Sequence, residues 1–144
     1  MRSSIDRRIL RGLDVNFKEE ETDLHRIVMN QLNEYFNGER KEFEIPLLMI
    51  GTPFQKSVWQ ELLKIPFGQT QTYLGITQKI GDEKSIRAVA NANGANAISI
   101  IVPCHRIVGS RGEMVGYAGG KKVKEKLLSL ESGNPTTEQM SLFN

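Results

Sequence analysis

Apolar residues recur at helical spacing in two stretches of the first half of the chain. The first stretch follows Thr22 and an acidic run and ends near Gly38, as is typical of a helix. The second begins at Thr52-Pro53, an N-cap with a first-turn proline, and Pro66 stops it. The apolar positions are Leu24, Ile27, Val28, Leu32, Tyr35 and Phe36, then Phe54, Val58, Trp59, Leu62 and Leu63. We expect a strand within residues 1–18 and a linker over 39–51 with a short strand around 43–48.

Two shorter helices follow in the second half of the chain. The pattern predicts one from Tyr73 to Ile80, ending at Gly81, and another over 83–93 that Asp82 caps. Two short helices joined by a glycine-containing turn are a candidate helix-turn-helix. Because helical pairs are common in proteins, this pattern alone does not establish DNA binding.

The remaining pattern predicts extended segments and a last helix. Residues 98–102 are an apolar, β-branched run, which indicates a buried strand or an extended segment. The pairs 107–108 and 114–115 flank a predicted hairpin turn at 109–112. A final helix is expected over 120–132. Its lysines are expected to form a solvated face, and they are Lys121, Lys122, Lys124 and Lys126.

Composition and charge narrow the class of protein. The 144 residues allow one full domain with a small appendage, and 39% hydrophobic with 25% charged residues is ordinary for a soluble protein. The chain has no apolar run of about 18 residues and no apolar core of a secretory signal at its start, so we expect an intracellular protein without a membrane span. Residues 51–144 carry 11 Lys and Arg against 7 Asp and Glu, whereas residues 1–50 carry 8 against 10. The second part is therefore the better partner for a polyanion.

The only cysteine lies in Pro103-Cys104-His105-Arg106, directly after the apolar run. A thiolate is the reactive form of cysteine, and a neighbouring base raises its fraction near neutral pH. His105 could be that base, directly or through a water, although the sequence does not say which group orients its ring. On this motif alone, a buried unreactive cysteine stays open. One cysteine excludes an internal disulfide and, with two histidines, a usual structural zinc site, so we expect no metal.

An ordered series of motifs runs from Thr52 to Glu131, more than half of the chain. The series is Thr52-Pro53-Phe54-Gln55, Val58-Trp59, Ile65-Pro66-Phe67-Gly68, Thr72-Tyr73, Arg87-Ala88-Val89, Asn91-Ala92-Asn93, Asn96, residues 101–108, residues 116–120, and Lys124-Glu125 to Glu131. With these motifs and the gaps between them, the stretch resembles the catalytic domain of the O6-alkylguanine-DNA alkyltransferases over its whole length.

The resemblance implies catalytic roles for five residues. Cys104 matches the alkyl acceptor, and His105 matches the base that removes the thiol proton through a water. Glu131 matches the carboxylate that orients this histidine, although the helical pattern alone would place it in solvent. Asn96 matches the residue that braces the turn before the active-site segment, and a plain turn asparagine is its alternative. Tyr73 matches the tyrosine that helps turn the target phosphate and donates a proton to the purine, and its alternative is a core tyrosine.

The resemblance also implies how DNA is held. Arg87 matches the arginine that fills the gap left by the flipped base, and without the family it would be a surface charge. Small residues around it would allow a close approach to the minor groove, or would simply give tight helix packing. These are Ala88, Ala90, Ala92, Gly94 and Ala95. The carbonyls of Cys104 and Ile107 match acceptors for the guanine amino group. Tyr117 and Ala118 match the loop wall that closes over the base, with alanine where some members have serine.

The two ends of the chain depart from the family. Residues 1–50 are shorter than its usual N-terminal domain, an α/β unit related to ribonuclease H. The tail resembles the pentapeptide by which bacterial repair proteins dock on the replication sliding clamp, and the alternative is a tail that packs on its own domain or frays. The residues of that motif are Gln139, Met140, Leu142 and Phe143.

These patterns together predict an α+β protein. We expect a shortened N-terminal α/β (ribonuclease H-like) remnant over 1–50, a mostly α-helical, winged-helix-like catalytic domain over 51–132, and a flexible tail over 133–144. The resemblance implies DNA repair by a single-turnover alkyltransferase that acts on O6-alkylguanine in double-stranded DNA. It also implies a monomer that needs no cofactor and is located in a bacterial-type cytoplasm. The alternatives are a non-catalytic lesion sensor, against which Cys104 counts, and a Cys-His hydrolase, for which no oxyanion-hole pattern is visible.

Overall fold

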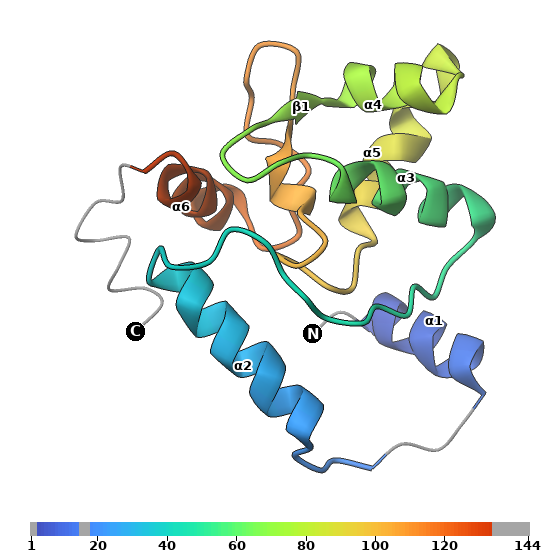
Figure 1. Cartoon of the computed structure of the whole chain (residues 1–144). Coiled ribbons are helices and arrows are strands. Elements are labelled where there is room, and N and C mark those ends of the chain that lie inside the picture. Colours follow the sequence, from blue (N-terminus) through green and yellow to red (C-terminus); the bar gives the residue numbers. More distant parts are fainter. Residues whose placement is uncertain (1–2, 15–17, 134–144) are drawn as a thin grey trace.

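Helices dominate the computed structural model, which describes residues 3–14 and 18–133 (Figure 1). The elements are α1 (Ser3–Leu13), α2 (Asp23–Phe36), α3 (Pro53–Leu63), β1 (Gln71–Thr72), α4 (Tyr73–Ile80), the 3-10 turn η1 (Glu83–Ser85), α5 (Ile86–Gly94), the 3-10 turn η2 (Cys104–Arg106), β2 (Ile107–Val108) and α6 (Lys121–Glu131). The two strands form one small parallel sheet. A helix-rich mixed fold is thus confirmed. Within the described ranges, no helix is long and apolar enough to cross a membrane.

Local capping sets the beginnings of α2 and α3 where the sequence predicts them. The Thr22 side chain accepts a hydrogen bond from the backbone N–H of His25, whose side chain bonds back to the backbone of Thr22. Thr52 and Gln55 make the same reciprocal box at α3, with Pro53 in its first turn. Because these bonds join residues three positions apart, the sequence alone is sufficient to predict them.

The described part of residues 1–50 contains two helices and no strand, so the strands predicted there are wrong. Residues 3–13 form α1 instead of a strand, because Ile5, Ile9 and Leu13 are spaced four apart and share one helix face. Residues 43–48 are an irregular linker. The α/β character expected of this segment is therefore not found in its described part.

The segment before Cys104 is also not the predicted strand. Ile100 has a φ of 75°, and the Val102 N–H donates to the Ile98 carbonyl at 2.9 Å, so the chain makes a tight turn. Asn96 holds this turn, because its Nδ2 donates to the Val102 carbonyl at 2.9 Å and its Oδ1 accepts from the Ile98 N–H at 3.0 Å. These bonds come from a side chain just before the run, so the β-branched composition of the run itself gives no sign of them.

The predicted hairpin is correct only in its turn. The Gly109 N–H donates to the Glu113 carbonyl at 2.9 Å, which closes the turn. However, β2 pairs in parallel with β1, with Gln71 opposite Ile107, and residues 114–115 form no strand. The sheet therefore connects the active-site segment to the start of α4.

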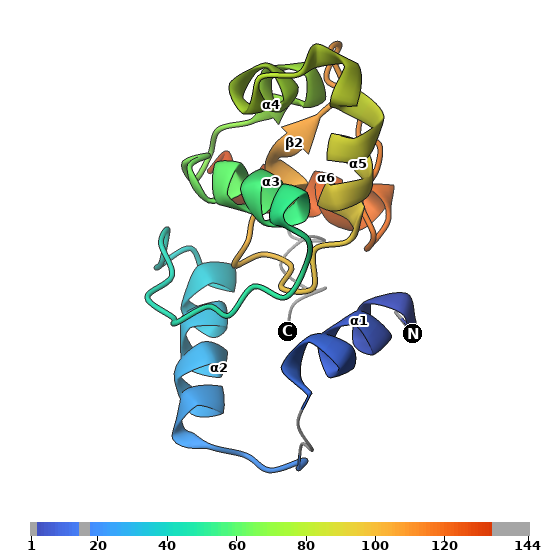
Figure 2. The same cartoon turned by 90° about the vertical axis from the view of Figure 1, so that its right-hand side faces the viewer.

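The main core lies between α3, α4, α5 and the segment that carries Cys104 (Figure 2). The short helices α4 and α5 have the bounds that the sequence predicts to within three residues, with Gly81 ending α4 at a φ of 98°. A second cluster joins Tyr35 of α2 to Leu127 and Leu130 of α6. The segment that carries Cys104 is thus enclosed by the helical pair on one side and by α6 on another.

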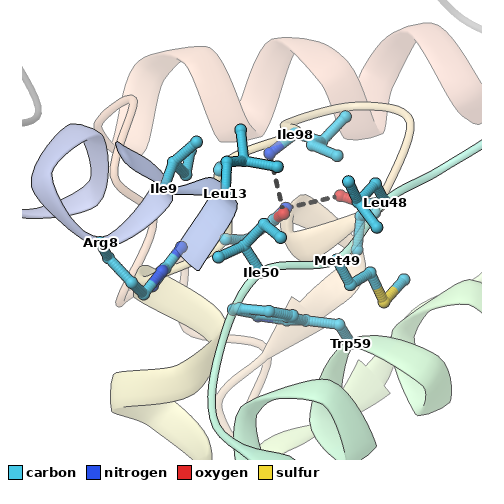
Figure 3. A pocket seen from close by; sticks show the side chains of 11 residues that line it. Arg8, Ile9, Leu13, Leu48, Met49, Ile50, Trp59 and Ile98 are labelled. Carbon is cyan, nitrogen blue, oxygen red and sulfur yellow. Dashed lines mark hydrogen bonds between the residues drawn. The ribbon is translucent and has the colours of Figure 1, made fainter. Parts of the chain in front are cut away.

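A cavity of about 170 Å³ separates α1 from the main core (Figure 3). Ile9 and Leu13 of α1 face it from one side, and Trp59 and Ile98 face it from the other. Arg8 spans the contact, since its guanidinium lies 5.1 Å from the Trp59 ring centroid and its Nη2 donates to the Ala95 carbonyl at 2.8 Å. α1 is therefore attached next to the C-terminal end of α5.

Candidate active site at Cys104

Cys104 opens the 3-10 turn η2 and is 3% exposed. Its backbone is fixed on both sides, because its N–H donates to the Val102 carbonyl at 2.8 Å and its carbonyl accepts from Asn93 Nδ2 at 3.3 Å. Asn93 lies in the last turn of α5, and Asn96 lies two residues beyond the end of this helix. The end of α5 therefore holds the cysteine segment through two buried asparagines.

His105 and Glu131 form a buried pair. His105 Nε2 lies 2.6 Å from Glu131 Oε1, and the side chains are 0% and 1% exposed. His105 Nδ1 is buried and has no hydrogen-bond partner within the described residues. If Nε2 carries the proton that faces the carboxylate, Nδ1 is an unprotonated acceptor. The pair that the resemblance implies is thus in contact.

Electrostatics keep this pair in the form of a neutral base and an ionised carboxylate. Burial lowers the pKa of His105, and the bond to Glu131 only partly opposes this. Burial would raise the pKa of Glu131, but hydrogen bonds from His105 and Arg106 outweigh it and hold that pKa at about 2. Near neutral pH, the imidazole can therefore take up a proton and have its charge balanced.

Two further partners of Glu131 were not predicted from the sequence. Arg106 is 7% exposed, and its Nε and Nη2 donate to the two carboxylate oxygens at 2.9 Å each, while its Nη1 donates to the Ile65 carbonyl at 2.7 Å. The Tyr35 hydroxyl donates to Glu131 Oε1 at 2.8 Å. The position of Arg106 next to His105 was a possible signal, whereas nothing local connects Tyr35 with a residue 96 positions away.

Lys124 is buried, so the prediction of a solvated lysine face is wrong at this position. Its Nζ donates to the Ile107 carbonyl and, at 2.9 Å, to the Val115 carbonyl. Burial lowers its pKa to about 8. The reason is the helix phase, since Lys124 lies three and seven positions before the buried Leu127 and Glu131. Lys121 and Lys122 are exposed, and Lys126 is half-buried.

Tyr73 begins α4 and is 7% exposed. Its hydroxyl donates to the Val115 carbonyl at 2.9 Å, and burial raises its pKa, so it stays protonated. Gly116 packs against this hydroxyl: a Cβ there would come within 2.4 Å of it, at a φ of 73°. The loop after β2 therefore needs glycine where it passes the tyrosine.

Arg87 and Ala88 are exposed on the outer side of α5, Ala90 is half-buried against the main core, and Gly94 is half-buried at the end of the helix. Arg87 and Ala90 line a hollow of about 400 Å³ together with Tyr73 and the loop over 109–116, and Cys104 does not line it. Ala92 is 2% exposed and packs in the core, because it shares the inner helix face with Val89. Its side chain therefore does not reach the outer surface, contrary to its expected place at DNA.

The remaining predicted residues lie around the same segment. The Ile107 carbonyl points to Lys124, Tyr117 is half-buried against both core clusters, and Ala118 is exposed. The predicted clamp-binding residues over 139–143 lie outside the described residues. In the described ranges, no group of three or more His, Cys, Asp or Glu side chains is placed to hold a metal ion.

The site thus joins two short helices, α4 and α5, to a buried cysteine beside a histidine–glutamate pair. A family model described as 6-O-methylguanine DNA methyltransferase, DNA binding domain, matches residues 53–133. The methylated-DNA–protein-cysteine methyltransferase of Methanosarcina mazei is 50% identical over 115 residues, which are 80% of this chain and 73% of that protein. The constitutive enzyme of Bacillus subtilis is 45% identical over 117 residues, with 81% and 71% covered.

Solved structures agree with this match. The crystal structure of Mycobacterium tuberculosis OGT in complex with DNA superposes with a TM-score of 0.77 at 45% identity, covering 83% of this chain and 74% of that one. The O6-methylguanine-DNA methyltransferase of Pyrococcus kodakaraensis gives a TM-score of 0.69 at 25% identity, covering 90% and 75%. The chain therefore belongs to the 6-O-methylguanine DNA methyltransferase family.

Proposed function

We propose that this chain repairs O6-alkylguanine in double-stranded DNA by moving the alkyl group onto Cys104, one group per molecule. Relatives named methylated-DNA–protein-cysteine methyltransferase support this, as does the relative solved in complex with DNA. One observation carries the proposal to this chain. His105 is bonded to Glu131 at 2.6 Å, while its other ring nitrogen is buried and has no hydrogen-bond partner in the part of the chain that the structure describes. That nitrogen is available to accept the thiol proton, directly or through a water.

The reaction we propose is a displacement at carbon. His105 takes the Cys104 proton, and Glu131 stabilises the imidazolium that results. The thiolate then attacks the alkyl carbon, so that the S–C bond forms while the C–O6 bond breaks. The product is a thioether, which no group described in the site can cleave. The protein is therefore consumed in the reaction.

The leaving purine needs a proton, and we assign this role to Tyr73. Its raised pKa keeps the hydroxyl protonated, and its present bond to the Val115 carbonyl would pass to the flipped base. Imidazolium and phenolate then exchange protons with solvent, which restores both side chains. The carbonyls of Cys104 and Ile107 each accept one bond already, from Asn93 and Lys124. A carbonyl has two lone pairs, so each can also accept from the guanine amino group.

We further propose that the outer face of α5 enters the minor groove. Arg87 is exposed at its first turn, and Ala88 and Ala90 leave room for a close approach. The arginine would fill the gap that the flipped base leaves. Asn96 would brace the turn beneath, and Tyr117 and Ala118 would close over the base. Ala92, being in the core, acts through packing instead.

Several finer features stay predictions. They are the winged-helix-like character of residues 51–132, the relation of residues 1–50 to a ribonuclease H-like domain, the tail boundary at 133, the monomeric state, the location in the cell and the lack of a cofactor. The buried contacts of α2 and α6 favour a segment 1–50 that supports the fold without contributing a nucleophile.

Intact-mass measurement after mixing with O6-methylguanine DNA tests the proposed function. We expect the protein to gain one methyl group and the Cys104→Ser variant to gain none. DNA bound tightly without any mass gain would instead support a non-catalytic lesion sensor and would exclude the transfer reaction.

We also propose that residues 139–143 dock on a sliding clamp. Their order, a glutamine followed by Leu142 and Phe143, is typical of a segment that hydrogen-bonds once and fills an apolar pocket. We expect the isolated tail peptide to bind a bacterial clamp, and a peptide with Leu142→Ala and Phe143→Ala not to bind. Absence of binding by the unaltered peptide at high micromolar concentration would end this idea.

A further inference from the structure

Tyr35 links the N-terminal helix α2 to the active-site carboxylate. It lies in the last turn of α2, outside the residues 53–133 that the family model matches, and it is 0% exposed. Its hydroxyl donates to Glu131 Oε1 at 2.8 Å. The lower part of α2 extends away from the catalytic part, whereas its C-terminal end lies next to α6 (Figure 1). The contact between the two is therefore local to this end of the helix.

The phenol ring is fixed from several sides. Its centroid lies 5.3 Å from that of Phe36, 5.5 Å from Phe43 and 6.1 Å from Phe67. Leu127 and Leu130 of α6 complete the cluster. A ring held by three aromatic neighbours loses little further freedom when its hydroxyl makes a hydrogen bond. The position of the donor is thus determined by packing and does not depend on the bond itself.

The oxygen that Tyr35 contacts is also the one that holds His105. Glu131 Oε1 receives His105 Nε2 at 2.6 Å, Arg106 Nη2 at 2.9 Å and the Tyr35 hydroxyl at 2.8 Å. Arg106 Nε also approaches this oxygen, at 3.2 Å. Hydrogen bonds are electrostatically strong in a buried site, and donors that share one oxygen compete for its electron density. Removal of the Tyr35 hydroxyl should therefore strengthen the bonds from His105 and Arg106 and allow the carboxylate to move.

We infer that Tyr35 is a positioning residue of the transfer reaction, whose hydroxyl fixes the Glu131 carboxylate and limits how strongly it holds His105. The inference rests on the proposed function, because it assigns Tyr35 a part in the action of that base. It makes a segment remote in sequence a component of the active site. Tyr35 acts only through Glu131 and His105 and touches no reacting atom.

The Tyr35→Phe variant removes the hydroxyl and keeps the ring contacts. Without this donor, Oε1 stabilises the imidazolium more strongly, so the pKa of His105 rises. We expect its NMR titration midpoint to rise by roughly half a pH unit. In the pH profile of the methyl-transfer rate, the acid limb should also move to higher pH. The rate on the plateau of this profile should fall by about 3- to 10-fold, because the carboxylate loses its position. The chain has two histidines, so His25, at the other end of α2, serves as the internal reference.

Gln31→Leu is the matched control on the same helix. The Gln31 side chain joins α2 to the linker through two bonds to the Glu44 backbone, at 2.9 and 3.2 Å, and is not among the donors to Glu131. This variant should lower the melting temperature and leave the His105 midpoint in place. A second variant, Tyr35→Met, also lacks the hydroxyl but has a different shape, and it replaces Tyr35→Phe if that variant folds poorly. It should raise the titration midpoint of His105 in the same way.

The outcomes separate the two claims. The inference is overturned if the titration midpoint of His105 is unchanged in both Tyr35 variants. It is also overturned if Gln31→Leu shifts this midpoint equally, because the packing of α2 would then explain the effect. If the unaltered protein accepts no methyl group, the proposed function fails. The titration of His105 then still decides whether Tyr35 acts on the Glu131–His105 pair.

Discussion

At the scale of single residues, one buried carboxylate organises the site. Glu131 is ionised because His105 and Arg106 surround it, and its pKa lies at about 2 despite its burial. A buried charge of this kind is tolerable only while its partners remain, since the loss of one partner leaves the others without compensation. Glu131 thus joins groups from α2, η2 and α6, and in the reaction that we propose the reactivity of Cys104 depends on them.

The depressed pKa of Glu131 makes stability depend on pH. The ordinary value is 4.5, so the contribution is complete above about pH 4.5 and is lost as the pH falls towards 2. We expect the free energy of unfolding of the protein to fall more steeply across this window than that of Glu131→Gln, by roughly 3 kcal/mol in total. Urea unfolding at a series of pH values measures both. Parallel pH dependences in the two proteins would show that Glu131 is not stabilised by its partners.

At the scale of elements, the sequence predicts those parts whose causes are local. The bounds of α2, α3 and α4 follow from caps, proline and glycine within a few positions of each end. The turn at residues 98–102 depends on bonds from the Asn96 side chain, which lies just before the run, and the pairing of β2 depends on β1. The apolar, β-branched composition of the run itself shows neither cause. The burial of Lys124 follows from the phase of α6, and the burial of Arg106 follows from its contacts with Glu131 and Ile65, although the charge of both residues favours exposure.

The site residues divide in the same way. The motif around Cys104 and the resemblance together predict Cys104, His105 and Glu131, and the structure brings His105 and Glu131 into contact. Tyr35 was predicted only as an apolar position of its helix. Its hydroxyl bond could not be foreseen, because helical spacing says which face is buried but not what that face contacts.

Lys124 joins α6 to Ile107 at the start of β2 and to the loop at Val115. The Lys124→Met substitution keeps an unbranched side chain of similar length but removes the ammonium group. The carbonyls of Ile107 and Val115 therefore lose the donor that they share. We expect the methyl-transfer rate to fall about tenfold, as for the loss of one charged hydrogen bond. Single-turnover kinetics with methylated DNA measure this.

Lys122→Met is the control for Lys124, because it makes the same change at an exposed position of the same helix. Its transfer rate should match that of the unaltered protein. Equal rates in the two variants would mean that the loop needs no ammonium to hold it.

At the scale of the whole molecule, two N-terminal helices join the catalytic part at separate places. α1 is attached by Arg8 at the end of α5, and α2 by Tyr35 at Glu131. In our proposal, DNA lies on the outer face of α5, and the reaction takes place at the buried thiol that η2 holds. The family relation and this geometry together imply a protein that acts once, because a thioether on Cys104 cannot revert.

The measurement that tests this most directly is the number of methyl groups accepted per molecule from an excess of O6-methylguanine DNA, with peptide mapping of the modified residue. We predict a plateau at one methyl group, located on Cys104, with no further repair after longer incubation. Repair that continues beyond one lesion per molecule, or a methyl group on any other residue, would contradict the account.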